Sequence, residues 1–148
     1  MDSLQIFELG IIANSVSILT CQDKNCEFGD FQSSDLRNSM LDAILKMNSV
    51  IWSQDIQSFN LRKYKIIVLV KNPKTSSFLF YCVGDTKLNV KFIKSVLERV
   101  SIRFFEQFPD VIEANTYPLN LLKKFNPVLS EIIKNLHENQ TRKLKSVI

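Results

Sequence analysis

The sequence is poor in the residues that usually build catalytic sites, metal sites and disulfide frameworks. Its 148 residues include one histidine, three cysteines, three glycines and four prolines. The low glycine and proline content excludes a collagen-like or low-complexity chain. Three cysteines leave one thiol over and do not make a disulfide framework, so we expect a reduced, intracellular protein. A single histidine excludes most histidine-based catalysis, and we expect neither an enzyme nor a cofactor.

A targeting segment and a membrane span are also missing from the sequence. The first ten residues, MDSLQIFELG, lack the basic start of a secretory signal. No run approaches the roughly 18 apolar residues that a membrane span needs. We therefore expect a cytoplasmic protein that would meet a membrane only peripherally.

Hydrophobic residues make up 45% of the chain, which is enough for one packed domain. We predict a single domain over residues 1–148, with a core over 4–136 and a basic C-terminal tail over 137–148. The net charge of +4 is uneven, because residues 1–60 are net acidic and residues 61–148 are net basic. A basic half can favour phosphates, nucleic acid or an anionic membrane. Because these basic residues are spread out and lack interleaved exposed aromatics, we do not expect nucleic-acid binding.

Runs of β-branched and aromatic residues predict five strands. They lie at residues 4–9, 16–21, 55–61, 63–71 and 77–83. The first two are expected to form a hairpin that turns through Gly10 and residues 14–15. The runs at 63–71 and 77–83 are apolar in their middle on both faces, which is typical of strands covered from two sides.

Apolar residues that recur every three or four positions predict long helices over 35–52 and 90–108. Asn89 is the expected N-cap of the second, and Pro109 prevents its continuation. A turn of helix is expected over 119–124. A third helix should begin at Asn126, with this asparagine as its cap, and should fray from His137 onward.

The resulting element order is β-β-α-β-β-β-α-α. Short turns join the strands wherever no helix intervenes, so the sheet should be mainly antiparallel. Strands that are apolar on both faces require cover on both sides. We therefore predict an α/β chain of the α+β type, with a five-stranded, mainly antiparallel sheet sandwiched between helices.

Several segments in this order resemble those of longin-type domains. They are the opening hairpin LQIFELGIIANSVSIL, the apolar helix SSDLRNSMLDAILKMNSVIW, the strand pair DIQSFNLRKYKIIVLV, the strand FLFYCVGD, the helix end RFFEQFPD and the later KFNPVLSEII. The resemblance covers residues 4 to about 136, and rests on an ordered pattern of elements rather than an invariant motif. It departs from a minimal longin domain in the longer stretch at 110–126. It implies a longin/profilin-like fold, with one helix on one face of the sheet and two on the other.

The resemblance also implies a scaffold that binds other proteins. Longin domains bind small GTPases, vesicle-fusion and coat components, or another longin or roadblock-type domain, and some pair as regulatory platforms for small GTPases. We expect a non-enzymatic interaction module of membrane trafficking, with a homodimer as one outcome. The alternative is a small-molecule-sensing α/β sandwich, although strands filled with Phe, Ile, Leu and Val favour a packed interior over a ligand pocket.

Few residues offer reactive chemistry. Cys21, Cys26, Cys82 and His137 are potential zinc ligands, but they lack the paired spacing of a structural site. Ser130 lies two helical turns before His137, and no carboxylate is evident that would orient the imidazole. The three glycines cannot form a phosphate-binding loop. We expect no metal site and no catalytic residues.

Three surfaces are candidates for partner binding. The first helix carries Leu41, Leu45 and Trp52 beside its main apolar row, and its loop neighbours Phe28 and Phe31 form a second candidate. Open sheet edges are the third, because they can pair with a partner's strand. For each aromatic or apolar residue, burial in the core is the competing interpretation.

The basic residues near the C-terminus form a separate candidate surface, which could face an anionic membrane. They are Lys134, Arg142, Lys143 and Lys145. The competing interpretation is a solubilising tail.

Overall fold

The computed structural model describes residues 6–13, 16–22, 58–61, 64–71, 78–109 and 119–147. The helix predicted over 35–52 lies outside the described residues. The strands are β1 (Ile6–Ala13), β2 (Val16–Gln22), β3 (Ser58–Leu61), β4 (Tyr64–Lys71) and β5 (Phe78–Asp85). The helices are α2 (Val90–Gln107), α4 (Leu119–Leu122), the 3-10 turn η2 (Lys123–Phe125) and α5 (Asn126–Val147).

The strands form one sheet in the order β2-β1-β5-β4-β3, and every neighbouring pair is antiparallel. Four of them are seven or eight residues long, whereas β3 has four residues and pairs with β4 at one edge. The prediction of an α+β fold with an antiparallel sheet is confirmed.

The opening hairpin differs from the prediction. β1 continues through Gly10 to Ala13, so Gly10 is a strand residue and takes no part in the turn. The reason is the position of β1 inside the sheet, where residues 8–13 pair with β2 on one side and β5 on the other. Two ladders of hydrogen bonds outweigh the weak strand preference of one glycine.

Helix α2 begins and ends as the sequence predicts. The Asn89 side chain accepts a hydrogen bond from the Phe92 amide, with Oδ1 and N 2.9 Å apart, and the helix stops at Gln107 before Pro109. One stripe of the helix is buried. It consists of Ile93, Val96, Leu97, Val100, Ser101 and Phe104.

The last helix differs from two predictions, the capping role of Asn126 and the fraying from His137 onward. Asn126 has helical backbone angles, φ −56° and ψ −42°, because η2 runs directly into α5 and leaves no free helix end for its side chain to cap. Its Oδ1 atom is buried and has no hydrogen-bond partner among the described residues. The helix also continues to Val147 instead of fraying from His137, since Glu, Gln, Arg, Lys and Leu in this segment all favour helix.

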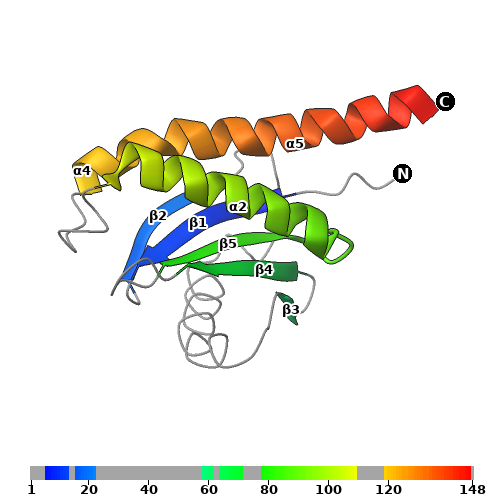
Figure 1. Cartoon of the computed structure of the whole chain (residues 1–148). Helices are drawn as coiled ribbons and strands as arrows, with labels where there is room; N and C mark the ends of the chain where they lie inside the picture. The colour runs from blue at the N-terminus through cyan, green and yellow to red at the C-terminus, as the bar shows by residue number, and fades with distance from the viewer. Residues whose placement is uncertain are drawn as a thin grey trace.

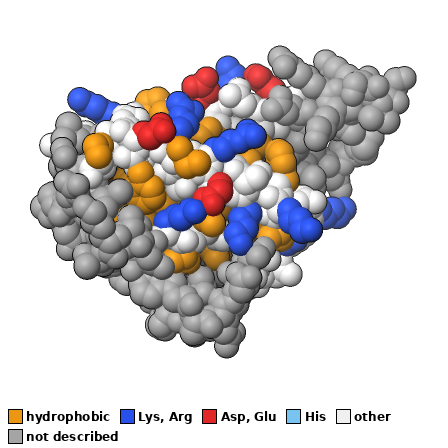
Figure 2. Space-filling view, in the orientation of Figure 1, with side chains coloured by type: hydrophobic (Ala, Val, Ile, Leu, Met, Phe, Trp, Pro, Cys, Tyr) orange, Lys and Arg blue, Asp and Glu red, His pale blue; other side chains and the backbone are white. Residues whose placement is uncertain are grey.

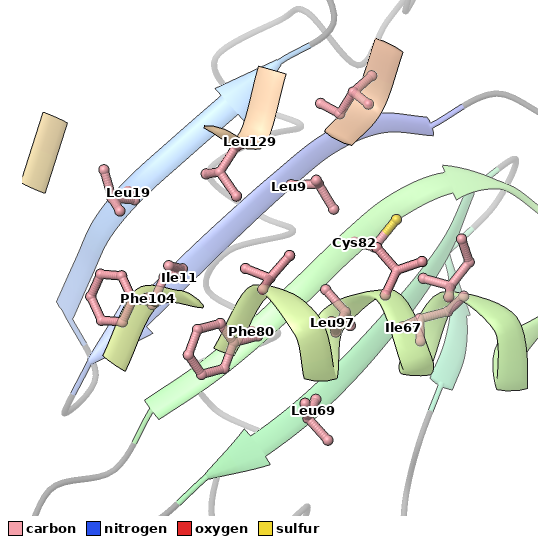
Figure 3. Close-up of a cluster of buried hydrophobic side chains, with 14 of the residues drawn as sticks. Leu9, Ile11, Leu19, Ile67, Leu69, Phe80, Cys82, Leu97, Phe104 and Leu129 are labelled. Atoms are coloured by element: carbon pink, nitrogen blue, oxygen red, sulfur yellow. The ribbon is translucent and has the colours of Figure 1, made fainter. Parts of the chain in front are cut away.

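Helices α2 and α5 lie side by side on the same face of the sheet (Figure 1). α2 packs on β4 and β5, and α5 packs on β1 and β2. The apolar side chains between these layers form one continuous core, part of which Figure 3 shows. Strands β4 and β5 contribute alternate residues to it, such as Phe78, Phe80 and Cys82 of β5.

Phenylalanine rings fill one end of this core. The ring of Phe104 lies 6.0 Å from that of Phe78, 6.1 Å from Phe80 and 5.4 Å from Phe125, each in an edge-to-face arrangement. Edge-to-face pairs at these separations add favourable energy to the burial of the rings. The cluster joins β5, α2 and η2, so it fixes how the helical layer sits on the sheet.

The opposite face of the sheet is buried as well. Ile12, Ile66, Val68, Leu79 and Val83 alternate with the residues that face α2 and α5, and each is at most 2% exposed. The prediction that the central strands are buried on both faces is therefore confirmed.

Candidate functional site

The predicted partner-binding residues Leu41, Leu45, Trp52, Phe28 and Phe31 lie outside the described residues. The structure therefore does not test these surfaces.

The basic residues predicted to face a membrane are described only in part. Lys134 is exposed on α5. Arg142, Lys143 and Lys145 belong to the helical backbone of α5, but their side chains lie outside the described part of the chain.

The described residues among the four considered as zinc ligands lie in different surroundings. Cys82 is completely buried in the core, and the Cys21 thiol points to the Asn126 carbonyl oxygen at 4.0 Å. His137 contacts β1, and Cys26 lies outside the described residues. In the part of the chain that the structure describes, no three His, Cys, Asp or Glu residues gather as metal ligands.

His137 joins α5 to the start of the sheet. Its Nε2 atom accepts a hydrogen bond from the backbone N–H of Ile6 at 3.1 Å. His137 is half-buried, and the helix continues past it instead of fraying there. Ser130 is exposed on the same helix, two turns earlier. His137 Nε2 is not available to Ser130 as a general base, because it accepts the hydrogen bond from Ile6.

A buried polar pair on the other face of the sheet was missed by sequence reasoning. The Tyr81 hydroxyl of β5 donates a hydrogen bond to Glu8 Oε2 of β1, with the oxygens 2.7 Å apart, and both residues are fully buried. Tyr81 stands opposite Gly10 in the register, and its ring lies where a Cβ of residue 10 would be. The missing side chain of Gly10 lets the ring lean across β1 and reach Glu8.

The Cys82 thiol is chemically inert in this position. Burial in the apolar core raises the pKa of Cys82 far above its ordinary value, and the nearby charge of Glu8 raises it further. The thiolate is the reactive form of cysteine, so this residue acts as a small core side chain.

The outward side of α2 is the described surface with the most exposed apolar residues. Phe92 is 45% exposed and Ile102 is 55% exposed. Lys91, Arg99 and Arg103 are exposed beside them. On the face in view in Figure 2, which α2 crosses in Figure 1, hydrophobic, basic and some acidic side chains are interspersed.

Among the described residues no helix is both long enough and apolar enough to cross a membrane.

Comparison with known proteins finds no family model and no curated protein that matches the chain.

The sequence does contain a signal for the missed pair. Glu8 interrupts an apolar run, and Gly10 follows two positions later on the same strand face. A strand carboxylate next to a same-face glycine indicates that a long side chain from the neighbouring strand can cross over and bond to it. The sequence pattern does not predict that β1 pairs with β5, the strand that contains Tyr81.

We expect the Glu8–Tyr81 hydrogen bond to stabilise the fold. Tyr81→Phe keeps the ring over Gly10 but removes the hydroxyl, and should lower the free energy of unfolding by about 1–3 kcal/mol. Urea denaturation of the two single variants Tyr81→Phe and Glu8→Gln and of the double variant would measure their coupling. Strictly additive losses would show that the two side chains do not stabilise each other.

We expect the stability to fall at alkaline pH because of Cys82. The unfolded thiol ionises near its ordinary pKa of 9.0, whereas the raised pKa of Cys82 keeps the folded thiol protonated. Below pH 9 the thiol is protonated in both states and does not affect stability. Above pH 9 only the unfolded thiol ionises, so the free energy of unfolding falls by about 1.4 kcal/mol per pH unit. Urea midpoints measured on both sides of pH 9 should fall more steeply with pH for the wild type than for Cys82→Ala. The comparison between the two proteins cancels the contributions of the other titrating groups. Equal slopes would contradict this assignment.

Proposed function

We propose that this chain is a non-enzymatic protein-interaction module with a longin/profilin-like fold, which binds a small GTPase or another vesicle-trafficking protein. The observation that carries the proposal is the order of the elements. A hairpin, β1 and β2, is followed by β3, β4 and β5, and then by α2 and α5 on one face of an antiparallel sheet. In the full proposal the helix predicted over 35–52 covers the second face, which makes the five-stranded sheet a sandwich.

The filled interior supports a function on the exterior. Large side chains occupy the space between the sheet and the helices, among them Phe78, Phe80, Phe104 and Phe125. The buried carboxylate of Glu8 is bonded to Tyr81, and the Cys82 thiol is held protonated. A ligand-sensing domain would need a cavity with converging polar groups, so these contacts favour protein binding over the alternative of a small-molecule sensor.

The place of action and the assembly state belong to the same proposal. We infer a cytoplasmic protein that works at the periphery of membranes and pairs with a second copy or with another longin or roadblock-type domain. The sheet supports such pairing, since β2 and β3 are its two edge strands and edge strands can pair with a partner's strand.

Binding to small GTPases tests the proposal directly. The purified chain would be mixed with a panel of small GTPases, each loaded with GDP or with a non-hydrolysable GTP analogue, and studied by size-exclusion chromatography with light scattering. We expect a stable complex with at least one of them, or a dimer of the chain. A monomer that binds no GTPase and retains a co-purified small molecule would overturn the proposal in favour of the sensor.

Variants locate the contact in the same assay. Leu41→Asp and Leu45→Asp should abolish the complex and leave the circular dichroism spectrum unchanged, because a buried carboxylate at an interface is costly. Ser130→Asp, at an exposed position of α5, is the matched control and should bind normally. Loss of folding in the two leucine variants would assign these residues to the core instead.

A further inference from the structure

The outward side of α2 carries a surface that the proposed function does not use. We define the α2 outer face as the five exposed residues Lys91, Phe92, Arg99, Ile102 and Arg103. The residues on the opposite side of the helix are buried in the core. Phe92 and Ile102 are the two large hydrophobic side chains that are exposed in the described part of the chain.

Helix geometry places these residues on one side. Arg99 and Arg103 follow Phe92 by seven and eleven residues, and Ile102 follows Lys91 by eleven and Arg99 by three, all spacings that return to the same side of a helix. At 1.5 Å per residue, the ten positions from Phe92 to Ile102 span about 15 Å. The two apolar side chains therefore stand near opposite ends of this side, roughly 80° apart around the helix axis, with cations between and beside them.

The charge of this side is mainly positive. Lys91, Arg99 and Arg103 contribute three cations, and Glu106 is the exposed carboxylate on the same side. Glu98 is directed elsewhere, because its Oε1 forms an ion pair with Lys71 Nζ on the sheet at 2.8 Å. The face therefore attracts anionic partners.

We propose that the α2 outer face docks the protein on an anionic phospholipid surface. An exposed apolar side chain set among cations along a convex helix suits a bilayer, where Ile102 enters the interface and the cations meet phosphate groups. An acidic protein partner would instead favour a contiguous apolar centre within a ring of polar residues. The inference names the surface for the membrane-peripheral part of the proposed function and rests on that part, but it is independent of GTPase binding, because a trafficking partner could be bound elsewhere on the molecule whether or not α2 meets lipid.

Co-sedimentation with vesicles tests this inference. The probe is vesicles of phosphatidylcholine with and without phosphatidylserine, mixed with the full chain at low and at high salt. We expect binding to the phosphatidylserine vesicles that weakens with added salt. Absence of binding, or equal binding to both kinds of vesicle, would overturn the inference.

Variants separate a specific face from general basic charge. Arg99→Glu combined with Arg103→Glu should weaken vesicle binding by more than about tenfold, and Ile102→Ser should weaken it by about tenfold without a change of charge. Lys134→Glu reverses an exposed charge on α5 and is the charge control, for which we expect a smaller effect than for either α2 arginine reversed singly. All these positions are exposed, so circular dichroism and thermal unfolding should match those of the wild type.

Two variant results would contradict the inference. If Ile102→Ser binds like the wild type, Ile102 does not enter the bilayer, and the apolar part of the inference is lost. If Lys134→Glu weakens binding as much as Arg99→Glu, the attraction comes from the basic surface as a whole. Neither result bears on GTPase binding, so the two proposals fail independently.

Discussion

The fold depends on the burial of the central strands on both faces. β1 and β5 are paired on both sides and are covered above and below, so none of their backbone groups can rely on water. Such strands are stable only inside a complete sheet with cover on each face. Helices α2 and α5 supply this cover on one face, and the aromatic cluster around Phe104 joins them to β5.

Three polar groups in the described interior are accommodated individually. Glu8 accepts a hydrogen bond from Tyr81, Cys82 remains a neutral thiol, and the Ile6 amide donates to His137. The two hydrogen bonds each connect one element to another, so these polar groups serve the packing of the fold. We therefore propose functions that use the exterior, namely protein binding and lipid contact.

Periodicity and end signals predicted most of the described elements. The two-sided apolar runs located β4 and β5, and the spacing of apolar residues together with Asn89 and Pro109 located α2. These predictions succeeded because the local preference and the tertiary environment agree in these segments. The candidate partner residues of the first predicted helix and its loop remain predictions, because they lie outside the described residues.

The errors arose where a neighbouring element decides the conformation. Glycine is common in turns, but Gly10 is extended because β1 pairs with a strand on each side. The Tyr81 ring also occupies the space where a side chain of residue 10 would lie. Asparagine before proline is typical of a helix N-cap, but η2 runs directly into α5, so Asn126 is itself helical. The roles of Glu8 and His137 depend on contacts with residues more than 70 positions away, which no local pattern contains.

Amide hydrogen exchange tests whether the two-sided burial of β1, β5 and β4 holds the fold together. We predict that the slowest-exchanging amides lie in these three strands and exchange only through global unfolding, with faster exchange in the edge strand β3. Amides of β5 that exchange as fast as those of β3 would contradict it.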